Sequence, residues 1–341
     1  MNNIFIGKIS EYLSNNNQFD FSKNTLIIIG KNTYENSILY LENTFENKPK
    51  YLIITEKIIK ESFVNKYENY LDKYQIINIF SIGGGKIIDF TKSLIYKSSK
   101  KLNFIACPTT TGSGSEATNF FVLYKESGEK LSITSTKLKP NSIIFDENLV
   151  LKNNLKLMAT SSIDAICQCF ESLWARNKTE QSQKYAIKGL EILISNYKKY
   201  FHSDNSLAVI EMLKGSNYSG RAINISKTNG PHAFSYYLTF FHSIPHGEAV
   251  LLNFEKFLKM NFKFINKNYQ RIILNIFNIK DLEELIKWFQ RYKYRYGLIK
   301  SLDFINNIDY NSYRKSINEE RLSNNPVKIN LNKFLYDNFI H

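Results

Sequence analysis

Short runs of β-branched and aromatic residues alternate with helical patterns along the first half of the chain. Five such runs predict β-strands, over Thr25–Gly30, Tyr51–Thr55, Ile77–Ile82, Asn103–Cys107 and Ser142–Asp146. Strands that are apolar along their whole length and separated by helical segments are typical of a parallel sheet covered on both faces. The first half is therefore predicted to be an α/β domain with a parallel sheet.

The pattern changes near Leu151. Beyond it, apolar residues recur at helical spacing, as in LMATSSIDAICQCFESLW and QKYAIKGLEILISNYKKYF, and strand-like runs nearly vanish. We therefore predict two domains, an α/β domain over 1–152 and an all-α domain over 153–341. No internal repeat or flexible linker separates them, so we expect an extensive interface, and ligands commonly bind in clefts between such halves.

Composition excludes several classes of protein. With 43% apolar and 22% charged residues among 341, the chain resembles neither a disordered protein nor a disulfide scaffold. No apolar run approaches the roughly 20 residues of a membrane-spanning helix, and the N-terminus lacks a signal-peptide pattern. We expect a soluble, cytoplasmic protein whose three cysteines, Cys107, Cys167 and Cys169, are buried thiols.

Basic residues outnumber acidic ones, which raises the question of an anionic partner. Lys and Arg number 45 against 31 Asp and Glu, a net charge of +14. The excess is spread along the whole chain, with no block of about five or more like charges. Because nucleic-acid binding requires a clustered basic surface, we expect neither a nucleic acid nor a membrane as partner.

A glycine triplet, Gly83, Gly84 and Gly85, lies between a predicted strand and an amphipathic helix. Glycines let the backbone approach a pyrophosphate, and the helix N-terminus offers free N–H groups and partial positive charge. Lys86 could add a full charge. The spacing differs from the GxGxxG dinucleotide fingerprint, so a plain glycine-rich turn is the alternative interpretation.

A second loop, Pro108–Thr118, follows the next predicted strand and is dense in hydroxyl groups and glycine. Its side chains supply many hydrogen-bonding groups and little bulk, which suits contacts to ribose, phosphate and an amide. The sequence therefore favours a nucleotide contact here over an ordinary surface loop.

Candidate metal ligands stand in the helical half. Asp164 lies in a helical pattern, and Pro231 and Pro245 each place a following histidine, His232 or His246, in the first turn of a helix. Two imidazoles and a carboxylate could bind a divalent cation that polarises a carbonyl. Helix-cap or surface histidines are the alternative.

These motifs in this order, GGGxxxD, PTTTGSGSEAT, a helical aspartate and HAxxxxLxxxxxxPHGxA, resemble the iron-containing (group III) alcohol dehydrogenases, whose relatives include glycerol dehydrogenases and dehydroquinate synthases. The resemblance is strong over 75–255 and continues weakly to Glu320–Val327. It implies the fold of that family, an α/β dinucleotide-binding domain followed by a helical metal- and substrate-binding domain. It also implies an NAD(P)H cofactor and a divalent metal, Fe²⁺ or Zn²⁺.

Carried over residue by residue, the resemblance implies cofactor contacts at Gly83, Gly84, Gly85, Asp89, Thr109, Thr110, Ser113 and Lys130. It implies metal ligands at Asp164, His232 and His246, whereas His242 matches no ligand position. Two residues depart from the family pattern. Gln168 stands one helical turn after Asp164, where the family has a histidine ligand, and its amide oxygen is a weaker donor. Tyr236 replaces a histidine near the substrate and could relay a proton, as could water or the cofactor ribose.

Within the family, the stretches 170–180 and 220–228 look most like the phosphonoacetaldehyde reductase branch. That resemblance implies metal-assisted reduction of phosphonoacetaldehyde to 2-hydroxyethylphosphonate. A phosphonate requires cations near the metal, and Lys227 and Arg176 are the candidates, with solvated surface charges as the alternative. Lys227 is also a candidate catalytic residue, together with Tyr236.

Gly30 ends the first predicted strand and is followed by the cation Lys31. An acidic residue at this position would bond the ribose hydroxyls and repel the 2′-phosphate of NADPH. Because none stands here, NADPH should be accepted. Three other functions stay open. They are a dehydrogenase for another small polar or phosphorylated alcohol, for example in surface-polysaccharide synthesis, a lyase of the dehydroquinate synthase type, and a catalytically inactive nucleotide-binding homologue. The sequence leaves the oligomeric state open, with a homodimer among the options.

Overall fold

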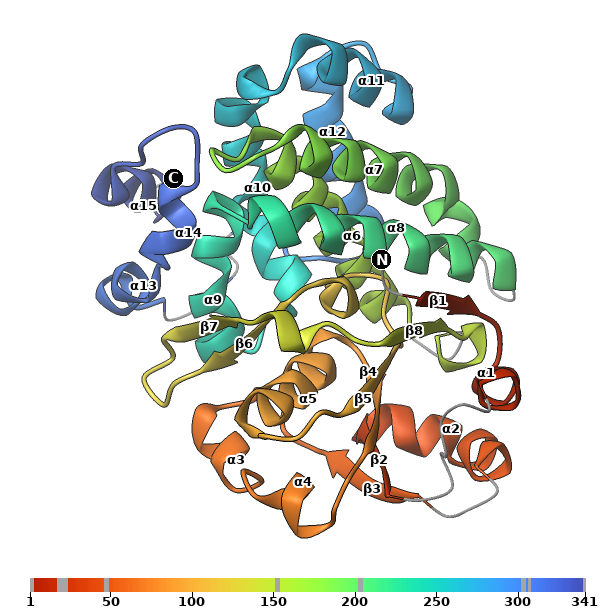
Figure 1. Cartoon of the computed structure of the whole chain (residues 1–341). Helices are drawn as coiled ribbons and strands as arrows, with labels where there is room; N and C mark the ends of the chain where they lie inside the picture. The colour runs from red at the N-terminus through yellow and green to blue at the C-terminus, as the bar shows by residue number, and fades with distance from the viewer. Residues whose placement is uncertain are drawn as a thin grey trace.

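The computed structural model of the chain describes residues 3–16, 24–45, 49–150, 154–201, 205–301, 305 and 308–339. Figure 1 shows an α/β half and a helical half packed directly on each other. The predicted boundary between 152 and 153 lies outside the described residues. The predicted fold class is confirmed, because a parallel sheet with helices precedes a helical domain.

The sheet has six parallel strands in the order β1-β8-β5-β4-β2-β3. Their bounds are β1 (Asn3–Ile6), β2 (Thr25–Gly30), β3 (Lys50–Ile54), β4 (Asn78–Gly83), β5 (Asn103–Pro108) and β8 (Ser142–Phe145). All five predicted strands are present, displaced by at most one residue at either end. The short edge strand β1 was not predicted.

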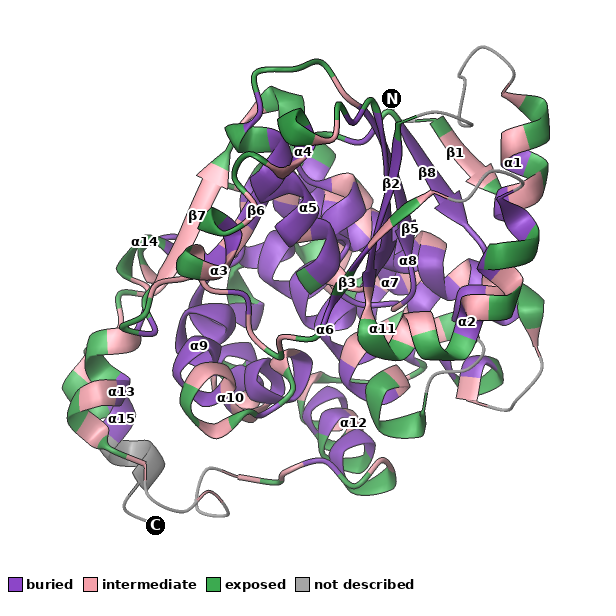
Figure 2. Cartoon of the chain, turned by 90° about the horizontal axis from the view of Figure 1, so that it is seen from below, coloured by how far each residue is buried: buried purple, intermediate pink, exposed green. Residues whose placement is uncertain are grey.

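Alternate residues of the central strands point to opposite faces of the sheet and enter two separate cores. One core contains α3 (Glu61–Asn65), α4 (Tyr70–Lys73) and α5 (Gly85–Lys97), and the other contains α1 (Ile9–Asn15) and α2 (Lys31–Thr44). Figure 2 shows the strands buried between these layers. Burial on both faces explains why the strands are apolar throughout.

A separate antiparallel hairpin, β6 (Phe120–Tyr124) and β7 (Lys130–Thr134), covers α5. Its turn contains Gly128 at a φ of +84°, a conformation that glycine adopts at little cost. The hairpin lies between α5 and the helical half (Figure 1). It was not predicted from the sequence.

The helical half is built around α6 (Leu155–Trp174), which packs against α7 (Glu180–Phe201), α8 (Ser206–Ser226) and α10 (His246–Asn261). The remaining helices are α9 (Gly230–His242), α11 (Lys267–Phe277), α12 (Leu282–Arg295), α13 (Tyr310–Ser316), α14 (Glu319–Ser323) and α15 (Leu331–Phe339), and the 3₁₀ turns are η1 (Ser115–Ala117), η2 (Thr136–Leu138), η3 (Glu147–Leu149) and η4 (Phe262–Phe264). Most side chains of α6 are buried, so this helix lies at the centre of the helical half and can hold polar side chains inside it.

The strand order places a crevice at a defined position. The chain moves from β2 outward to β3, then returns to the other side of β2 and continues through β4 to β5. In open parallel sheets, ligands bind at the carboxyl ends of the strands where the direction of winding reverses, here between β2 and β4.

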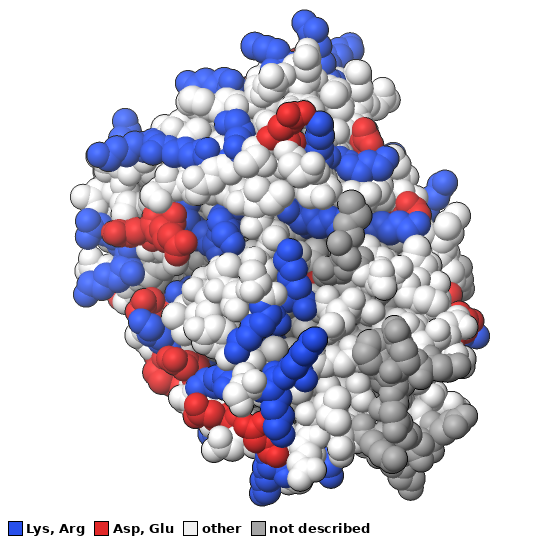
Figure 3. Space-filling model, viewed as in Figure 1, with Lys and Arg blue, Asp and Glu red and all other residues white. Residues whose placement is uncertain are grey.

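The surface and the buried thiols match the sequence pattern. Figure 3 shows Lys and Arg spread over the viewed face, with Asp and Glu among them. The three cysteines are buried and unpaired, as predicted. None of the described helices combines the length and the apolar character that crossing a membrane requires.

Candidate active site

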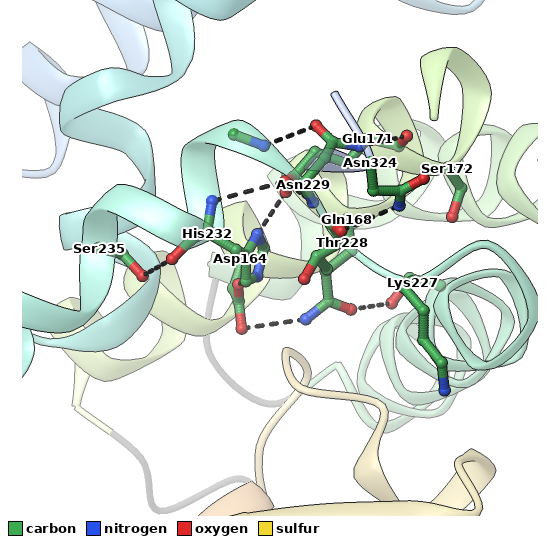
Figure 4. Close-up of polar contacts among 12 residues, drawn as sticks. Asp164, Gln168, Glu171, Ser172, Lys227, Thr228, Asn229, His232, Ser235 and Asn324 are labelled. Carbon is green, nitrogen blue, oxygen red and sulfur yellow. Dashed lines mark hydrogen bonds and ion pairs between the residues drawn. The ribbon is translucent and has the colours of Figure 1, made fainter. Parts of the chain in front are cut away.

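One face of α6 carries a line of buried polar side chains. Asp164, Gln168 and Glu171 are spaced four and then three residues apart, so they lie on the same side of the helix. Only 5%, 3% and 0% of their surfaces are exposed. Because buried carboxylates require partners, these side chains mark a polar site inside the helical half (Figure 4).

The first turn of α9 is bound to this face of α6. The backbone N–H of Asn229 donates to Glu171 over 2.8 Å, and the Asn229 side chain accepts from Trp174 Nε1 over 2.8 Å. Pro231 stands in the first turn, where its missing N–H is not needed. His232 follows, with Nδ1 hydrogen-bonded to the Glu171 carboxylate. The predicted helix start at Pro231 is confirmed.

Helix α10 approaches α6 so closely that its second residue must be glycine. A Cβ on Gly247 would lie 1.9 Å from the carbonyl oxygen of Thr160 and 2.9 Å from Cβ of Asp164. This contact sets His246, the first residue of α10, beside Asp164 and His232. The two imidazole rings have centroids 5.2 Å apart.

Asp164, His232 and His246 therefore converge as the sequence predicts. Each offers one ligand atom, and these atoms lie within 4.8 Å of one another. Asp164 Oδ1 is 3.2 Å from His232 Nε2, and neither buried atom has a hydrogen-bond partner among the described residues. Two imidazole nitrogens and a carboxylate oxygen that lack other partners fit a divalent cation such as Zn²⁺ or Fe²⁺.

The charges in this cluster suit metal ligation. Burial lowers the pKa of His246 to about 3, aided by His232 and Lys130. Burial alone would lower the pKa of His232, but the negative charges and hydrogen bonds of Glu171 and Asp164 outweigh it and raise this pKa to about 9. Burial alone would raise the pKa of Asp164, yet the two imidazoles hold it below its ordinary value. His246 is thus neutral and Asp164 ionised at neutral pH, whereas His232 must release a proton when a metal binds.

Gln168 lies next to the cluster, but its amide is bonded elsewhere. Nε2 donates to Asp164 Oδ2 over 3.2 Å, and Oε1 accepts from the Ser219 hydroxyl over 2.9 Å. In this arrangement Gln168 orients the Asp164 carboxylate and directs its own oxygen to Ser219. In this geometry Gln168 supports Asp164, and its predicted part as a fourth metal ligand stays a prediction.

The predicted nucleotide-binding glycines lie at the carboxyl ends of β2 and β4, beside the crevice. A Cβ on Gly83 would lie 2.6 Å from Ile87, and one on Gly85 would lie 2.4 Å from the Ser113 hydroxyl. Gly30 faces the same Ile87 side chain from β2. Packing around α5 therefore requires glycine at positions 83 and 85, whereas a Cβ on Gly30 would make an ordinary contact with Ile87 at 3.5 Å.

The hydroxyl-rich loop forms the wall between the two halves. Thr110 lies against Gly84, and the Thr109 N–H donates to the backbone of β4 over 3.1 Å. On its other side, Gly114 packs on Gly220 of α8, where a Cβ on Gly114 would lie 2.5 Å from the Gly220 Cα. The loop thus brings the predicted nucleotide site to the edge of the helical half.

Two predicted cofactor contacts are bonded within the protein. Asp89 accepts hydrogen bonds from the Ser115 hydroxyl and from the Val122 N–H, the latter over 3.1 Å, and so ties α5 to the hairpin. Lys86 donates to the backbone carbonyl of Glu56. Both side chains hold the walls of the crevice, and their part in cofactor binding stays a prediction.

Comparison with protein families decides the classification. Residues 3–147 match the family model described as "Iron-containing alcohol dehydrogenase", and residues 158–318 match the model "Fe-containing alcohol dehydrogenase family, C-terminal". The chain belongs to the iron-containing alcohol dehydrogenase family. The resemblance drawn from the motifs is confirmed.

Several relatives within the iron-containing alcohol dehydrogenases are similar to this chain. The 4-hydroxybutyrate dehydrogenase of Clostridium kluyveri is 28% identical over 58% of this chain and 58% of its own length. The phosphonoacetaldehyde reductase of Streptomyces viridochromogenes is 28% identical over 46% of this chain and 40% of its own. The chain thus spans about half the length of these curated relatives.

The solved structures of the family share the fold over almost the whole chain. The sulfoacetaldehyde reductase of Bifidobacterium kashiwanohense, solved with NAD⁺, has a TM-score of 0.84 and 22% sequence identity. The alignment covers 98% of this chain and 95% of that one. Similarity at this level of identity establishes the fold and leaves the activity to be argued from the site.

In this member of the iron-containing alcohol dehydrogenases, Lys130 and Tyr236 stack beside the three candidate metal ligands. The Lys130 ammonium lies 3.6 Å from the centre of the Tyr236 ring, and that ring stacks on His246 with centroids 6.1 Å apart. Burial raises the pKa of Tyr236 above its ordinary value. Tyr236 is therefore protonated at neutral pH and lies beside His246, and its catalytic role stays a prediction.

The two predicted substrate cations each follow the end of a helix. Lys227 lies at the C-terminal end of α8, between that helix and α9, with its side chain directed away from Asp164 (Figure 4). Arg176 is exposed just beyond Trp174, the last residue of α6, and donates to the Pro326 carbonyl over 3.4 Å. The ten residues of helix from Asp164 to Trp174 span about 15 Å. The roles of Lys227 and Arg176 as substrate contacts stay predictions.

Sequence reasoning missed two residues of this site. Glu171 lies seven residues after Asp164, a spacing that places both carboxylates on one helix face and could have revealed it. Arg321 is buried in α14, near both Lys227 and Lys130. It lies in the weakly matching C-terminal segment, where neither hydrophobic pattern nor motif spacing distinguishes it from a surface arginine.

Proposed function

We propose that this chain is a metal-assisted, NAD(P)H-dependent reductase that converts a small anionic aldehyde to the alcohol. The observation that carries the proposal is the convergence of Asp164, His232 and His246 next to the loop that borders the strand crevice. A redox site of this kind needs a nucleotide site and a carbonyl-polarising site that face each other. The interface between the two halves supplies both.

The α/β half would bind the dinucleotide. The N-terminus of α5, at Gly85, offers unbonded N–H groups and partial positive charge to a pyrophosphate, and Thr110 and Ser113 line the neighbouring loop. A bound nicotinamide would supply the hydride. Gly30, at the end of β2, leaves room for the adenosine ribose.

The helical half would bind the aldehyde. A divalent cation held by Asp164, His232 and His246 would supply Lewis-acid stabilisation of the negative charge that develops on the carbonyl oxygen. Glu171 fixes the ring orientation of His232 through Nδ1 and leaves Nε2 for the ligand position. Tyr236 holds its proton at neutral pH and lies beside His246, so it can donate to the nascent alcohol.

The substrate we propose is phosphonoacetaldehyde, reduced to 2-hydroxyethylphosphonate. The names of three similar proteins, for 4-hydroxybutyrate, phosphonoacetaldehyde and sulfoacetaldehyde, each specify a small molecule with an anionic group. Lys227 offers this chain a cation for such a group. A carboxylate-bearing semialdehyde, as suggested by the first of these relatives, is the second candidate.

We further propose that NADPH is accepted. The last residue of β2 is Gly30 and the next is Lys31, so no carboxylate directly follows β2 to repel a 2′-phosphate. The Lys31 ammonium lies 3.7 Å from the exposed Glu35 carboxylate of α2.

The test is to mix metal-loaded protein with NADH or NADPH and a panel of aldehydes, and to follow loss of the reduced-nicotinamide absorbance. We expect turnover of phosphonoacetaldehyde that requires added Zn²⁺ or Fe²⁺, and a preference between the two nicotinamides below about tenfold in kcat/KM. Full activity of demonstrably metal-free protein would refute the metal-assisted mechanism. Absence of turnover with every aldehyde would refute the reductase.

A further inference from the structure

Arg321 is a buried cation without an acidic partner. Its residue is 5% exposed, and its guanidinium has one hydrogen bond, to the Ser132 hydroxyl over 3.4 Å. No carboxylate lies within ion-pair distance of it in the described part of the chain. A guanidinium offers five N–H donors, so most of its hydrogen-bonding capacity is directed at no protein group. Burying a charge in this way is costly unless an anion is supplied from elsewhere.

Two lysines surround Arg321. Lys227 Nζ lies 4.4 Å from the centre of the Phe120 ring, and the Arg321 guanidinium lies 5.6 Å from the same ring centre. Burial and then Arg321 lower the pKa of Lys227 to about 8, against the opposing charge of Glu320. The pKa of Lys130 is lowered well below its ordinary value, first by burial and then by Arg321. Arg321 is thus close enough to each lysine to disfavour its positive charge.

The backbone at Lys227 shows that the segment is held in place by its surroundings. Lys227 has a φ of 60° and a ψ of 168°, a region that residues with a side chain rarely adopt. The flanking carbonyls of Ser226 and Thr228 both accept from Asn324 Nδ2, over 2.8 and 3.1 Å. Asn324 directly follows α14, the helix that carries Arg321. One short segment therefore fixes both Arg321 and the strained backbone of Lys227.

This group of cations adjoins the metal cluster. Lys130 lies over the Tyr236 ring, and that ring stacks on His246, so Lys130 connects the group to a candidate metal ligand. Lys130 is also close to Asp89 of α5, the helix that begins at the glycine triplet. An anion held among these side chains would therefore lie near both the candidate metal ligands and the proposed nucleotide position.

We propose that Lys227, Arg321 and Lys130 form an anion subsite that holds the phosphonate of the aldehyde, while its carbonyl faces Asp164, His232 and His246. The inference rests on the proposed function and adds to it the residues that select the substrate class. Two charged side chains, Arg321 and Lys227, with the Lys130 amine as a further N–H donor, suit a dianionic phosphonate better than a singly charged carboxylate. Phe120 forms the apolar base of the subsite.

The experiment compares two aldehydes of matched shape on zinc-loaded enzyme. Phosphonoacetaldehyde carries the dianion, and 3,3-dimethylbutanal replaces the phosphonate with a neutral tert-butyl group. We expect Arg321→Met and Lys227→Gly to lower kcat/KM for phosphonoacetaldehyde roughly 10- to 100-fold, mainly through KM. Turnover of 3,3-dimethylbutanal should stay within about threefold of wild type. Arg321→Lys should recover part of the loss.

Lys227→Gly separates recognition from folding. Glycine suits the backbone of this position, so the melting temperature should stay equal or rise while phosphonate recognition is lost. Arg271→Met, at an exposed arginine on α11, is the matched control and should leave both aldehydes unaffected. Equal losses on both aldehydes in Arg321→Met and Lys227→Gly would overturn the subsite.

A binding measurement keeps this inference separate from the reductase proposal. The product analogue 2-hydroxyethylphosphonate should raise the melting temperature of wild type, but not that of Arg321→Met. If this shift is found and no aldehyde is reduced, the subsite stands and the reductase is refuted. If both aldehydes are reduced equally well by wild type and no shift is found, the reductase stands and the subsite is refuted.

Discussion

Glu171 controls the state of a metal ligand without contacting the metal position. Its carboxylate bonds to His232 Nδ1 and to the Asn229 N–H, so it fixes both the ring and the helix end that carries it. We expect Glu171→Gln to weaken Zn²⁺ binding about 10- to 100-fold, because a neutral amide is a poorer acceptor for the imidazole. A metal titration monitored by calorimetry checks this.

Glu211→Gln is the control, since that carboxylate pairs with Lys214 on the surface of α8. A Glu171→Gln variant with wild-type zinc affinity would show that the carboxylate is dispensable for His232.

Gln168 offers a second test of the metal site. It lies one turn after Asp164 with its amide oxygen bonded to Ser219. We expect Gln168→His to tighten Zn²⁺ binding, about tenfold, because an imidazole at this position adds a stronger nitrogen donor. The zinc dissociation constant is the measurement. Unchanged or weaker binding would show that position 168 serves only to orient Asp164.

The charge on Lys227 makes substrate binding depend on pH. Its pKa is lowered to about 8 by burial and by Arg321, so the free enzyme loses this positive charge as the pH rises through that value. KM for sulfoacetaldehyde should be constant below pH 8 and rise above it. The sulfonate does not titrate in this range, which assigns the change to the protein. A KM that is flat between pH 7 and about 9.5 would contradict the assignment.

The residues of the site were predictable to different extents. His232 and His246 follow prolines that begin helices, and Asp164 lies on a helical pattern, so local sequence indicates all three. Arg321 depends on a contact between α14 and the hairpin, which local sequence does not specify. Arg176 is exposed beyond the end of α6, a position that spacing along the chain does not reveal.

At the scale of elements, the site depends on how closely α10 packs on α6. Gly247→Ala would place a methyl group 1.9 Å from the Thr160 carbonyl oxygen, so the start of α10 must move and take His246 with it. We expect a loss of about 1–3 kcal/mol in the free energy of unfolding, together with weaker zinc binding. Chemical denaturation and metal titration measure the two effects.

Gly297→Asn is a suitable control, because asparagine tolerates the φ of +61° at that position and no atom lies within 4 Å of the added Cβ. Zinc affinity that survives Gly247→Ala would mean that His246 is positioned independently of this contact.

The β6–β7 hairpin, which the sequence did not reveal, contributes residues to the proposed anion subsite. Strands β2, β4 and β5 are buried on both faces and therefore read as continuous apolar runs. Strands β6 and β7 form a two-stranded sheet apart from the main one, and β7 contains no fully buried residue, so their pattern is weak. Phe120 and Lys130 lie on this hairpin, which is why the cation group was not foreseen.

At the scale of the molecule, the proposed nucleotide site and the candidate metal ligands belong to different halves. The glycine triplet follows β4, whereas His246 begins α10. We expect His246→Ala to abolish zinc binding and turnover while changing the NADPH dissociation constant less than about threefold. Fluorescence titration with NADPH checks this. A parallel loss of both affinities would show that the two sites are coupled through the interface.

One contact between the halves constrains how they can move. Gly114 of the hydroxyl-rich loop and Gly220 of α8 touch backbone to backbone, with no side chain between them. Beside it, the Asn217 amide of α8 donates to Glu116 over 3.1 Å, and the Asn119 N–H donates to the Asn224 side chain of α8 over 2.8 Å. The loop is therefore tied to α8 at several points. Any motion of the two halves that keeps these contacts would pivot about the loop, so displacement would grow with distance from Gly114.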